Sequence, residues 1–145
     1  MTLAAPASHT SSASPAGVEH LNSPAFARTG LPFSEIVRAG QTLYLSGQMG
    51  TIPGTLSLVE GGVVAEARQA LRNVQAALAA HGYGLQHVVK CTVMLADMAD
   101  WAAFNEVYRE FFSAPYPARS AFGASGLALG GRLEIDVIAD TGTSA

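Results

Sequence analysis

One charged residue lies in an unusual setting near the C-terminal end of the chain. Arg119 follows Pro117 in a segment built otherwise of small and apolar residues. Charged side chains rarely lie among such residues without a partner. The partner is either a ligand carboxylate, which a guanidinium can bind through two hydrogen bonds, or a protein carboxylate on Glu134 or Asp136. Spacing alone leaves both open and slightly favours the protein carboxylate.

The two carboxylates belong to a segment with clean alternation. In LEIDV, the apolar residues at 133, 135 and 137 alternate with Glu134 and Asp136. This period predicts a strand with an apolar face and both carboxylates on the other face. The segment around Arg119 is predicted to form another short strand, and a turn of small residues separates the two.

The rest of the chain supplies elements that could position these strands. A hairpin is expected first, because the turn residues Gly40 and Gln41 separate two strand-like runs. A helix, a strand and a second helix then precede the C-terminal strands, with Asp97 as the expected N-cap of the second helix. The expected ranges are Phe33–Ala39, Thr42–Ser46, Val64–Ala80 and Val88–Leu95. This order predicts an α+β fold in which two helices cover one face of a mixed sheet. Apolar residues occupy both phases of the third strand, so we expect both of its faces to be covered.

Composition limits the classes of function. The 145 residues suit one domain, expected at 21–145 after a disordered tail at 1–20. Only 13% of residues are charged and 49% are hydrophobic, which favours burial of additional surface between subunits. The net charge of −3 and the scattered basic residues do not indicate a nucleic-acid partner. No targeting segment or membrane-length apolar run occurs, so we expect a cytoplasmic protein with no membrane association.

Cysteine and histidine usage points away from metal and thiol chemistry. Cys91, the single cysteine, lies in an apolar run and is expected to be a buried structural residue. The four histidines show no metal-ligand spacing. We therefore expect no metal.

Five motifs occur in the order known from one family. They are PFS at 32–34, LYLSGQMG at 43–50, EARQALRNVQAAL at 66–78, VVKCTVMLADMADWAAFNEVYREFF at 88–112, and PARS followed by LEIDVIA within 117–139. Together they make the chain resemble the reactive-intermediate deaminase family (RidA/YjgF, also called endoribonuclease L-PSP). The resemblance extends from about Pro32 to Ala139.

This resemblance implies a fold, an assembly and a reaction. The family fold is chorismate-mutase-like, and three subunits form a homotrimer whose sheets meet in a central β-barrel with clefts at the subunit boundaries. The family hydrolyses 2-imino acids, such as 2-iminopropanoate and 2-iminobutanoate, to 2-keto acids and ammonia. No cofactor is needed, because a protonated imine is already electrophilic.

The resemblance also implies roles for particular residues. Arg119 would bind the substrate carboxylate, and Glu134 would orient a water molecule and help to deprotonate it. The remaining implied substrate contacts are Ser46, Gly47, Trp101, Asn105, Ala121 and the residue at position 33.

Two positions depart from the family pattern. Phe33 stands where the family usually has tyrosine, so a hydroxyl that could bond substrate or water is missing. Losing one neutral hydrogen bond costs about 0.5–1.5 kcal/mol, which would slow catalysis without abolishing it. The apolar ring could also indicate a bulkier or more apolar imine. Ala121 stands where cysteine is frequent, and the contact there is expected to use the backbone.

Two other functions remain open. A trimer that binds a small 2-keto acid or amino acid without turnover is favoured by Phe33. The ribonuclease activity attributed to some family members is disfavoured by the pI near 5.7, the scattered basic residues and the lack of a histidine pair for acid–base work.

Overall fold

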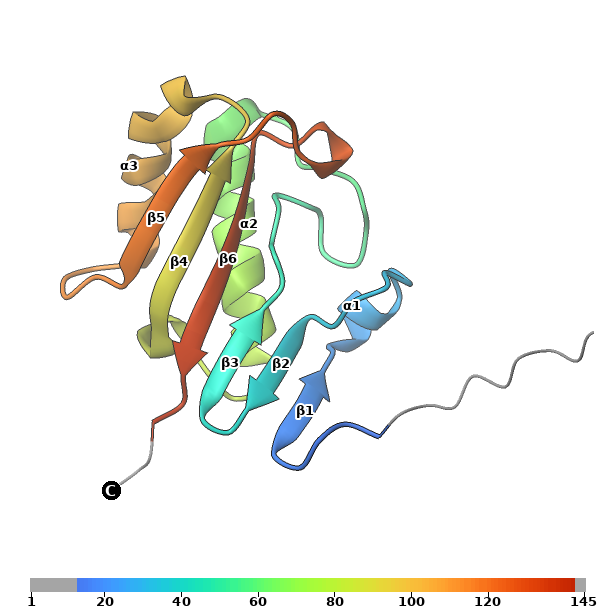
Figure 1. Cartoon of the computed structure of the whole chain (residues 1–145). Coiled ribbons are helices and arrows are strands. Elements are labelled where there is room, and N and C mark those ends of the chain that lie inside the picture. The colour runs from blue at the N-terminus through green and yellow to red at the C-terminus, as the bar shows by residue number, and fades with distance from the viewer. Residues whose placement is uncertain (1–12, 143–145) are drawn as a thin grey trace, which may run out of the picture.

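Six strands form one mixed sheet in the computed structural model, which describes residues 13–142 (Figure 1). The strand order is β1-β2-β3-β6-β4-β5. Neighbouring strands are antiparallel except β4 and β5, which are parallel. The predicted α+β class with a mixed sheet is confirmed. The strands are β1 (Val18–Leu21), β2 (Ile36–Ala39), β3 (Thr42–Leu45), β4 (Val88–Leu95), β5 (Ala118–Gly123) and β6 (Leu133–Asp140).

Two long helices, α2 (Gly62–Ala79) and α3 (Trp101–Phe111), lie on the same face of this sheet (Figure 1). Asp97 caps the helical run as predicted, since its carboxylate accepts a hydrogen bond from the Ala99 N–H at 2.9 Å. That bond starts a 3-10 turn, Met98–Asp100, which leads directly into α3. The apolar helix faces and the inward residues of the central strands together form the core.

The other face of the sheet carries no helix within the described residues. In β4 the buried phase includes Cys91, Val93 and Leu95, whereas the alternate phase is half-buried. The expectation that both faces of this strand would be covered is therefore wrong for the single chain. Large apolar side chains are exposed on this open face, including Tyr44 (49%) and Phe122 (48%).

The N-terminal part of the chain holds two elements that the sequence did not predict. Residues 18–20, expected in the tail, belong to β1, which pairs with β2. Of the rest of the expected tail, residues 13–17 are exposed and belong to no helix or strand, and residues 1–12 lie outside the described residues. The short helix α1 (Pro24–Ala27) follows, with the Ser23 hydroxyl accepting a hydrogen bond from the Phe26 N–H at 3.2 Å. The proline at its first position suits a helix start because no N–H is needed there.

Element boundaries differ modestly from the expectations. β2 begins three residues later than expected because residues 33–35 form a bend beside α1. The loop between β3 and α2 contains an isolated antiparallel bridge between Thr51 and Leu58. The helix α2 and the strand β4 match their predicted ranges within two residues. No helix among residues 13–142 is long and apolar enough to span a membrane.

Candidate active site

Arg119 lies on edge strand β5 with its side chain against α3. Its backbone position pairs with Cys91, whose buried side chain marks the helix-covered face of the sheet. The guanidinium Nη2 donates a hydrogen bond to Asn105 Oδ1 at 2.6 Å. Its Cζ lies 4.8 Å from the ring centroid of Tyr108 and 5.6 Å from that of Phe104. Aromatic faces attract the cation and hold it in place without neutralising its charge.

A surface cavity of about 320 Å³ surrounds this guanidinium. Among residues 13–142, no ion pair involves Arg119, so the favoured pairing with Glu134 or Asp136 is wrong. The residues that contact the guanidinium come from α3 and supply an amide oxygen and aromatic rings. The lining consists of Trp101, Asn105, Tyr108, Arg109, Tyr116, Pro117 and Arg119.

The Tyr108 side chain contacts the guanidinium through its ring and stays neutral. Its hydroxyl donates to Cys91 Sγ at 3.5 Å inside the core. Burial is the main cause that raises the pKa of Tyr108, and burial likewise raises the pKa of the Cys91 thiol. Cys91 is fully buried, as predicted, and contributes no thiolate to the site.

Glu134 lies on β6 and faces away from the helices. It alternates with Leu133 and Ile135, which are fully buried. Gly47 lies directly against it, because a Cβ at position 47 would overlap the Glu134 carboxylate. A two-way backbone bridge fixes this approach: Gln48 N donates to Ile135 O at 2.7 Å, and Ile135 N donates to Gln48 O at 2.9 Å. The motif LSGQ therefore needs glycine at this position for close contact with the carboxylate.

The surroundings of Glu134 raise its pKa above the ordinary range of a glutamate. Burial is the larger cause, and the negative charge of Asp136, one pleat away on the same face, is the second. A carboxylate that binds its proton more tightly is a better general base when ionised and a usable acid when protonated.

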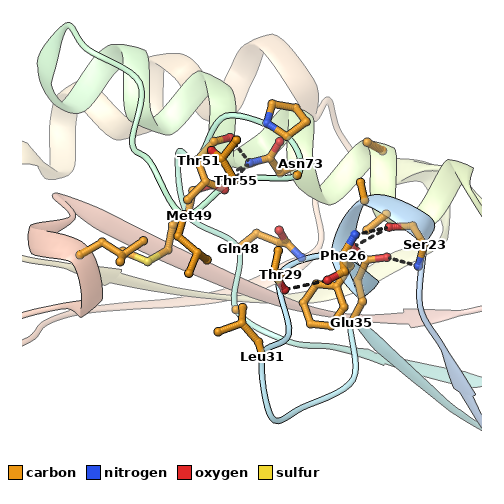
Figure 2. Close-up of a pocket in the computed structure, with 18 of the residues that line it drawn as sticks. Ser23, Phe26, Thr29, Leu31, Glu35, Gln48, Met49, Thr51, Thr55 and Asn73 are labelled. Atoms are coloured by element: carbon orange, nitrogen blue, oxygen red, sulfur yellow. Dashed lines mark hydrogen bonds between the residues drawn. The ribbon is translucent and has the colours of Figure 1, made fainter.

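A second cavity, of about 560 Å³, adjoins Glu134. It lies where β3 diverges from β6 beyond Tyr44, and loop 46–56 and α2 form part of its wall. Figure 2 shows side chains from α1, from this loop and from α2 around the cavity. Phe33, Gly47 and Glu134 all line it.

Arg119 and Glu134 lie well apart within one chain. Arg119 is level with Val137 on β6, through Cys91 on the strand between them. Two strand spacings correspond to roughly 10 Å, and the three residues from Val137 to Glu134 add roughly 10 Å along the strand. Their side chains also project from opposite faces of the sheet.

The expected site residues therefore fall into three groups. Trp101 and Asn105 lie with Arg119, whereas Phe33 and Gly47 lie with Glu134. Two others line neither cavity. The Ser46 hydroxyl donates to Ser34 O at 2.6 Å, and Ala121 packs against the core from β5.

Many other lining residues were not predicted, and three of them lie close to Arg119 or Glu134 or have unusual backbone geometry. Tyr116 lies between two prolines beside Arg119, and Leu129, with φ of 61°, lines the cavity at Glu134. Gln48 belongs to the motif LYLSGQMG, and its side chain reaches into that cavity (Figure 2). The glutamine in LSGQ was the available signal, whereas nothing near Leu129 indicated its place. Among residues 13–142, no three histidine, cysteine or carboxylate side chains cluster as a metal site would require.

Comparisons with known proteins agree on one family. The family described as Endoribonuclease L-PSP matches residues 24–141. A goat (Capra hircus) protein named 2-iminobutanoate/2-iminopropanoate deaminase is 47% identical over 111 residues, covering 77% of this chain and 81% of the goat protein.

Solved structures of similar proteins have the same fold. RidA from an Antarctic Psychrobacter species has a TM-score of 0.72 and 42% identity, covering 76% of this chain and 89% of that one. Escherichia coli TdcF, solved with bound serine, has a TM-score of 0.71 and 35% identity, covering 76% and 88%.

Proposed function

Because the chain belongs to the endoribonuclease L-PSP (RidA/YjgF) family, we propose that it hydrolyses reactive 2-imino acids to 2-keto acids and ammonia. The observation that carries the proposal is the guanidinium of Arg119. It is held by Asn105 and two aromatic rings and has no carboxylate partner among the described residues. A substrate carboxylate would supply that missing partner. The serine bound to TdcF is a small ligand that carries such a carboxylate.

Glu134 supplies the proton transfers in this proposal. As water attacks the carbon of the protonated imine, Glu134 accepts a proton from the water, and the C=N π electrons move to nitrogen, which becomes a neutral amine. The protonated Glu134 then returns this proton to the amine of the tetrahedral intermediate. The C–N bond breaks to release ammonia, and Glu134, ionised again, takes the proton of the carbinol oxygen, which becomes the keto oxygen; Glu134 then passes this proton to solvent. The raised pKa of Glu134 suits both directions of transfer.

The two halves must come from different subunits to act on one small molecule. Arg119 and Glu134 project from opposite faces of one sheet, so no short 2-imino acid reaches both within a chain. We infer a homotrimer in which Arg119 of one subunit and Glu134 of its neighbour complete each cleft. The exposed apolar side chains on the uncovered sheet face, Tyr44 and Phe122 among them, are consistent with burial against a neighbouring subunit.

The reaction is tested by generating an imine in place. An amino-acid oxidase supplies the 2-imino acid, and the protein should accelerate its decay to keto acid and ammonia above the uncatalysed rate. A protein that binds the keto acid but leaves imine decay unchanged would instead be the non-catalytic carboxylate-binding trimer, which the missing hydroxyl of Phe33 favours.

The shared cleft is tested by mixing two impaired variants and measuring kcat/KM, that is, activity at substrate concentrations well below the wild-type KM. A 1:1 mixture of Arg119→Ala and Glu134→Gln subunits, exchanged in mild denaturant, should regain about a quarter of wild-type activity, because one cleft in four combines two intact residues. Each variant treated alone is the control. Mixed trimers, confirmed by mass spectrometry, whose kcat/KM does not rise above that of the two variants treated alone would rule out a shared cleft.

A further inference from the structure

The cavity beside Glu134 is much larger than a small imine requires. Its volume of about 560 Å³ falls within the range of pockets that hold drug-sized ligands, about 300–1,000 Å³. The side chain of 2-iminopropanoate is a single methyl group, which would leave most of this space unfilled. Apolar side chains from four separate segments line it, among them Phe26, Leu31, Phe33, Met49, Leu56 and Leu129.

The polar groups of the lining are mostly bonded to one another. The Asn73 amide donates to Met49 O and Thr51 O, both at 2.9 Å. The Thr29 and Thr55 hydroxyls each donate to a backbone carbonyl, at 2.7 and 2.8 Å. Figure 2 shows several of these bonds within the cavity wall. Groups that are already paired offer little to a polar substrate side chain, so the wall presents a mainly apolar surface.

One wall is braced by a buried carboxylate. Glu35, 7% exposed, accepts hydrogen bonds from Ser23 N and Ser23 Oγ, both at 3.2 Å, while its own N–H donates to Asn22 Oδ1 at 2.8 Å. These bonds fix the start of α1, which places the Phe26 ring 5.6 Å from the Phe33 ring. The cavity therefore has a preformed wall on the side of α1.

Only two lining side chains have polar groups without a hydrogen-bond partner within the described chain, Glu134 and Gln48. They are neighbours, because Gln48 bridges to Ile135, the residue after Glu134. The cavity thus has two adjacent polar side chains, Gln48 and Glu134, beside a largely apolar space. An imine carbon attacked next to Glu134 would have its side chain directed into that space.

We propose that the preferred substrates are 2-imino acids with a long or branched apolar side chain, of the size found in leucine, methionine or phenylalanine. This inference rests on the proposed deaminase function and names its substrate class. Phe33 then extends the apolar wall where a tyrosine would add a hydroxyl.

The test compares imines of different side chains in one assay. An L-amino-acid oxidase generates each imine, and semicarbazide captures what the deaminase does not hydrolyse. The rate with deaminase is divided by the uncatalysed decay of the same imine. We expect the leucine- and methionine-derived imines to exceed the alanine-derived imine by about tenfold or more in kcat/KM, since a methylene in an apolar pocket contributes roughly that factor. The glutamine-derived imine, similar in length to that of methionine, should fall below it.

A cavity-filling variant locates the effect. Ala76 on α2 is exposed and lines the cavity, so Ala76→Leu should occupy space there without disturbing the core. It should lower the leucine-to-alanine activity ratio about tenfold. Ala79→Leu, one turn later on the same helix and outside the lining, is the matched control and should leave that ratio unchanged.

The outcomes separate this inference from the proposed function. If only the alanine-derived imine is hydrolysed, or if Ala76→Leu leaves the ratio unchanged while melting like wild type, the substrate class is wrong and the deaminase remains. If no imine is hydrolysed, the deaminase function itself fails, and the substrate class with it.

Discussion

The surroundings of Arg119 and Glu134 differ in almost every physical respect. Arg119 lies in a cavity of about 320 Å³ whose walls are aromatic rings and an amide oxygen, with its charge intact. Glu134 adjoins a cavity of about 560 Å³ that is mainly apolar, and burial there makes its charge harder to sustain. One region stabilises an ion, whereas the other resists ionisation.

That difference matches the two separate tasks that we propose for these residues. Binding a carboxylate calls for a permanent cation with free donors, and arginine keeps its charge at any working pH. Proton transfer calls for a group that can change its charge near the working pH. Keeping the two residues on opposite faces of one sheet also prevents them from neutralising each other, which would happen if they paired within the chain.

The largest effect is expected from removing the carboxylate that we propose as the proton acceptor. Glu134→Gln keeps the shape of the side chain but cannot accept a proton, and general acid–base groups contribute about 10²- to 10⁴-fold. We expect kcat to fall by that order while calorimetry shows unchanged affinity for pyruvate or 2-oxobutanoate. Asp140→Asn, an exposed carboxylate on the same strand, is the control and should keep wild-type kcat. A large loss of keto-acid affinity in Glu134→Gln would contradict the division of tasks.

The next effect concerns the bound carboxylate. Arg119→Ala removes hydrogen bonds to a charged group, each of about 1.5–3 kcal/mol, so KM should rise roughly tenfold to a hundredfold and keto-acid binding should weaken alike. Arg119→Lys should recover little, because an ammonium lacks the planar two-point geometry. Arg72→Ala, on the exposed side of α2, is the control.

Melting temperatures provide a separate check on this division. Arg119 pairs with no carboxylate among residues 13–142, so neither Arg119→Ala nor Glu134→Gln leaves a buried charge without its partner. Both variants should melt near wild type. Severe destabilisation of both would indicate a structural role instead.

A smaller effect is expected at Phe33, which lines the cavity beside Glu134. Phe33→Tyr adds a hydroxyl beside the cavity of Glu134, at a residue that is 49% exposed and can accept the addition. A new hydrogen bond to substrate or water would raise hydrolysis of small imines by up to about tenfold, which corresponds to ~1.4 kcal/mol. Steady-state rates with the alanine-derived imine measure this. An unchanged or lower rate would mean that the cavity is shaped around the phenyl ring.

Much of this arrangement could be read from the sequence because it depends on local patterns. The alternation around Glu134 and Asp136 predicted both the strand and the face of the carboxylates, and the motif around Asp97 predicted a cap. The order of the strands in the sheet could not be predicted from local patterns. The pairing of β5 beside β4 places Arg119 over the rings of α3, and that pairing depends on contacts far apart in sequence.

The N-terminal wall of the cavity was missed for a related reason. β1 and α1 are four residues each, too short for a periodic signal, and Glu35 secures α1 through hydrogen bonds that span twelve residues or more. Sequence patterns therefore did not predict the cavity, although Phe33 indicated an apolar edge of the site.

The smallest effect is a shift in pH dependence that separates the two regions. The pKa of Glu134 is raised, so the ionised form that our proposal requires is lost as pH falls through that raised value. The acid limb of the kcat/KM profile, which reports the free protein, should therefore lie above the ordinary range of a glutamate. Asp136→Asn removes the second cause of the shift while the larger one, burial, remains. In Asp136→Asn the acid limb of the pH profile should therefore move modestly to lower pH and still lie above the ordinary pKa range of a glutamate. Because the folded state binds this proton more tightly than the unfolded chain does, Glu134 favours folding at low pH, and that contribution is lost as pH rises through the folded pKa. Glu134→Gln should flatten the change of melting temperature with pH over that window, whereas Arg119→Lys should leave it unaltered. An acid limb that stays in place in Asp136→Asn would mean that another group limits the rate.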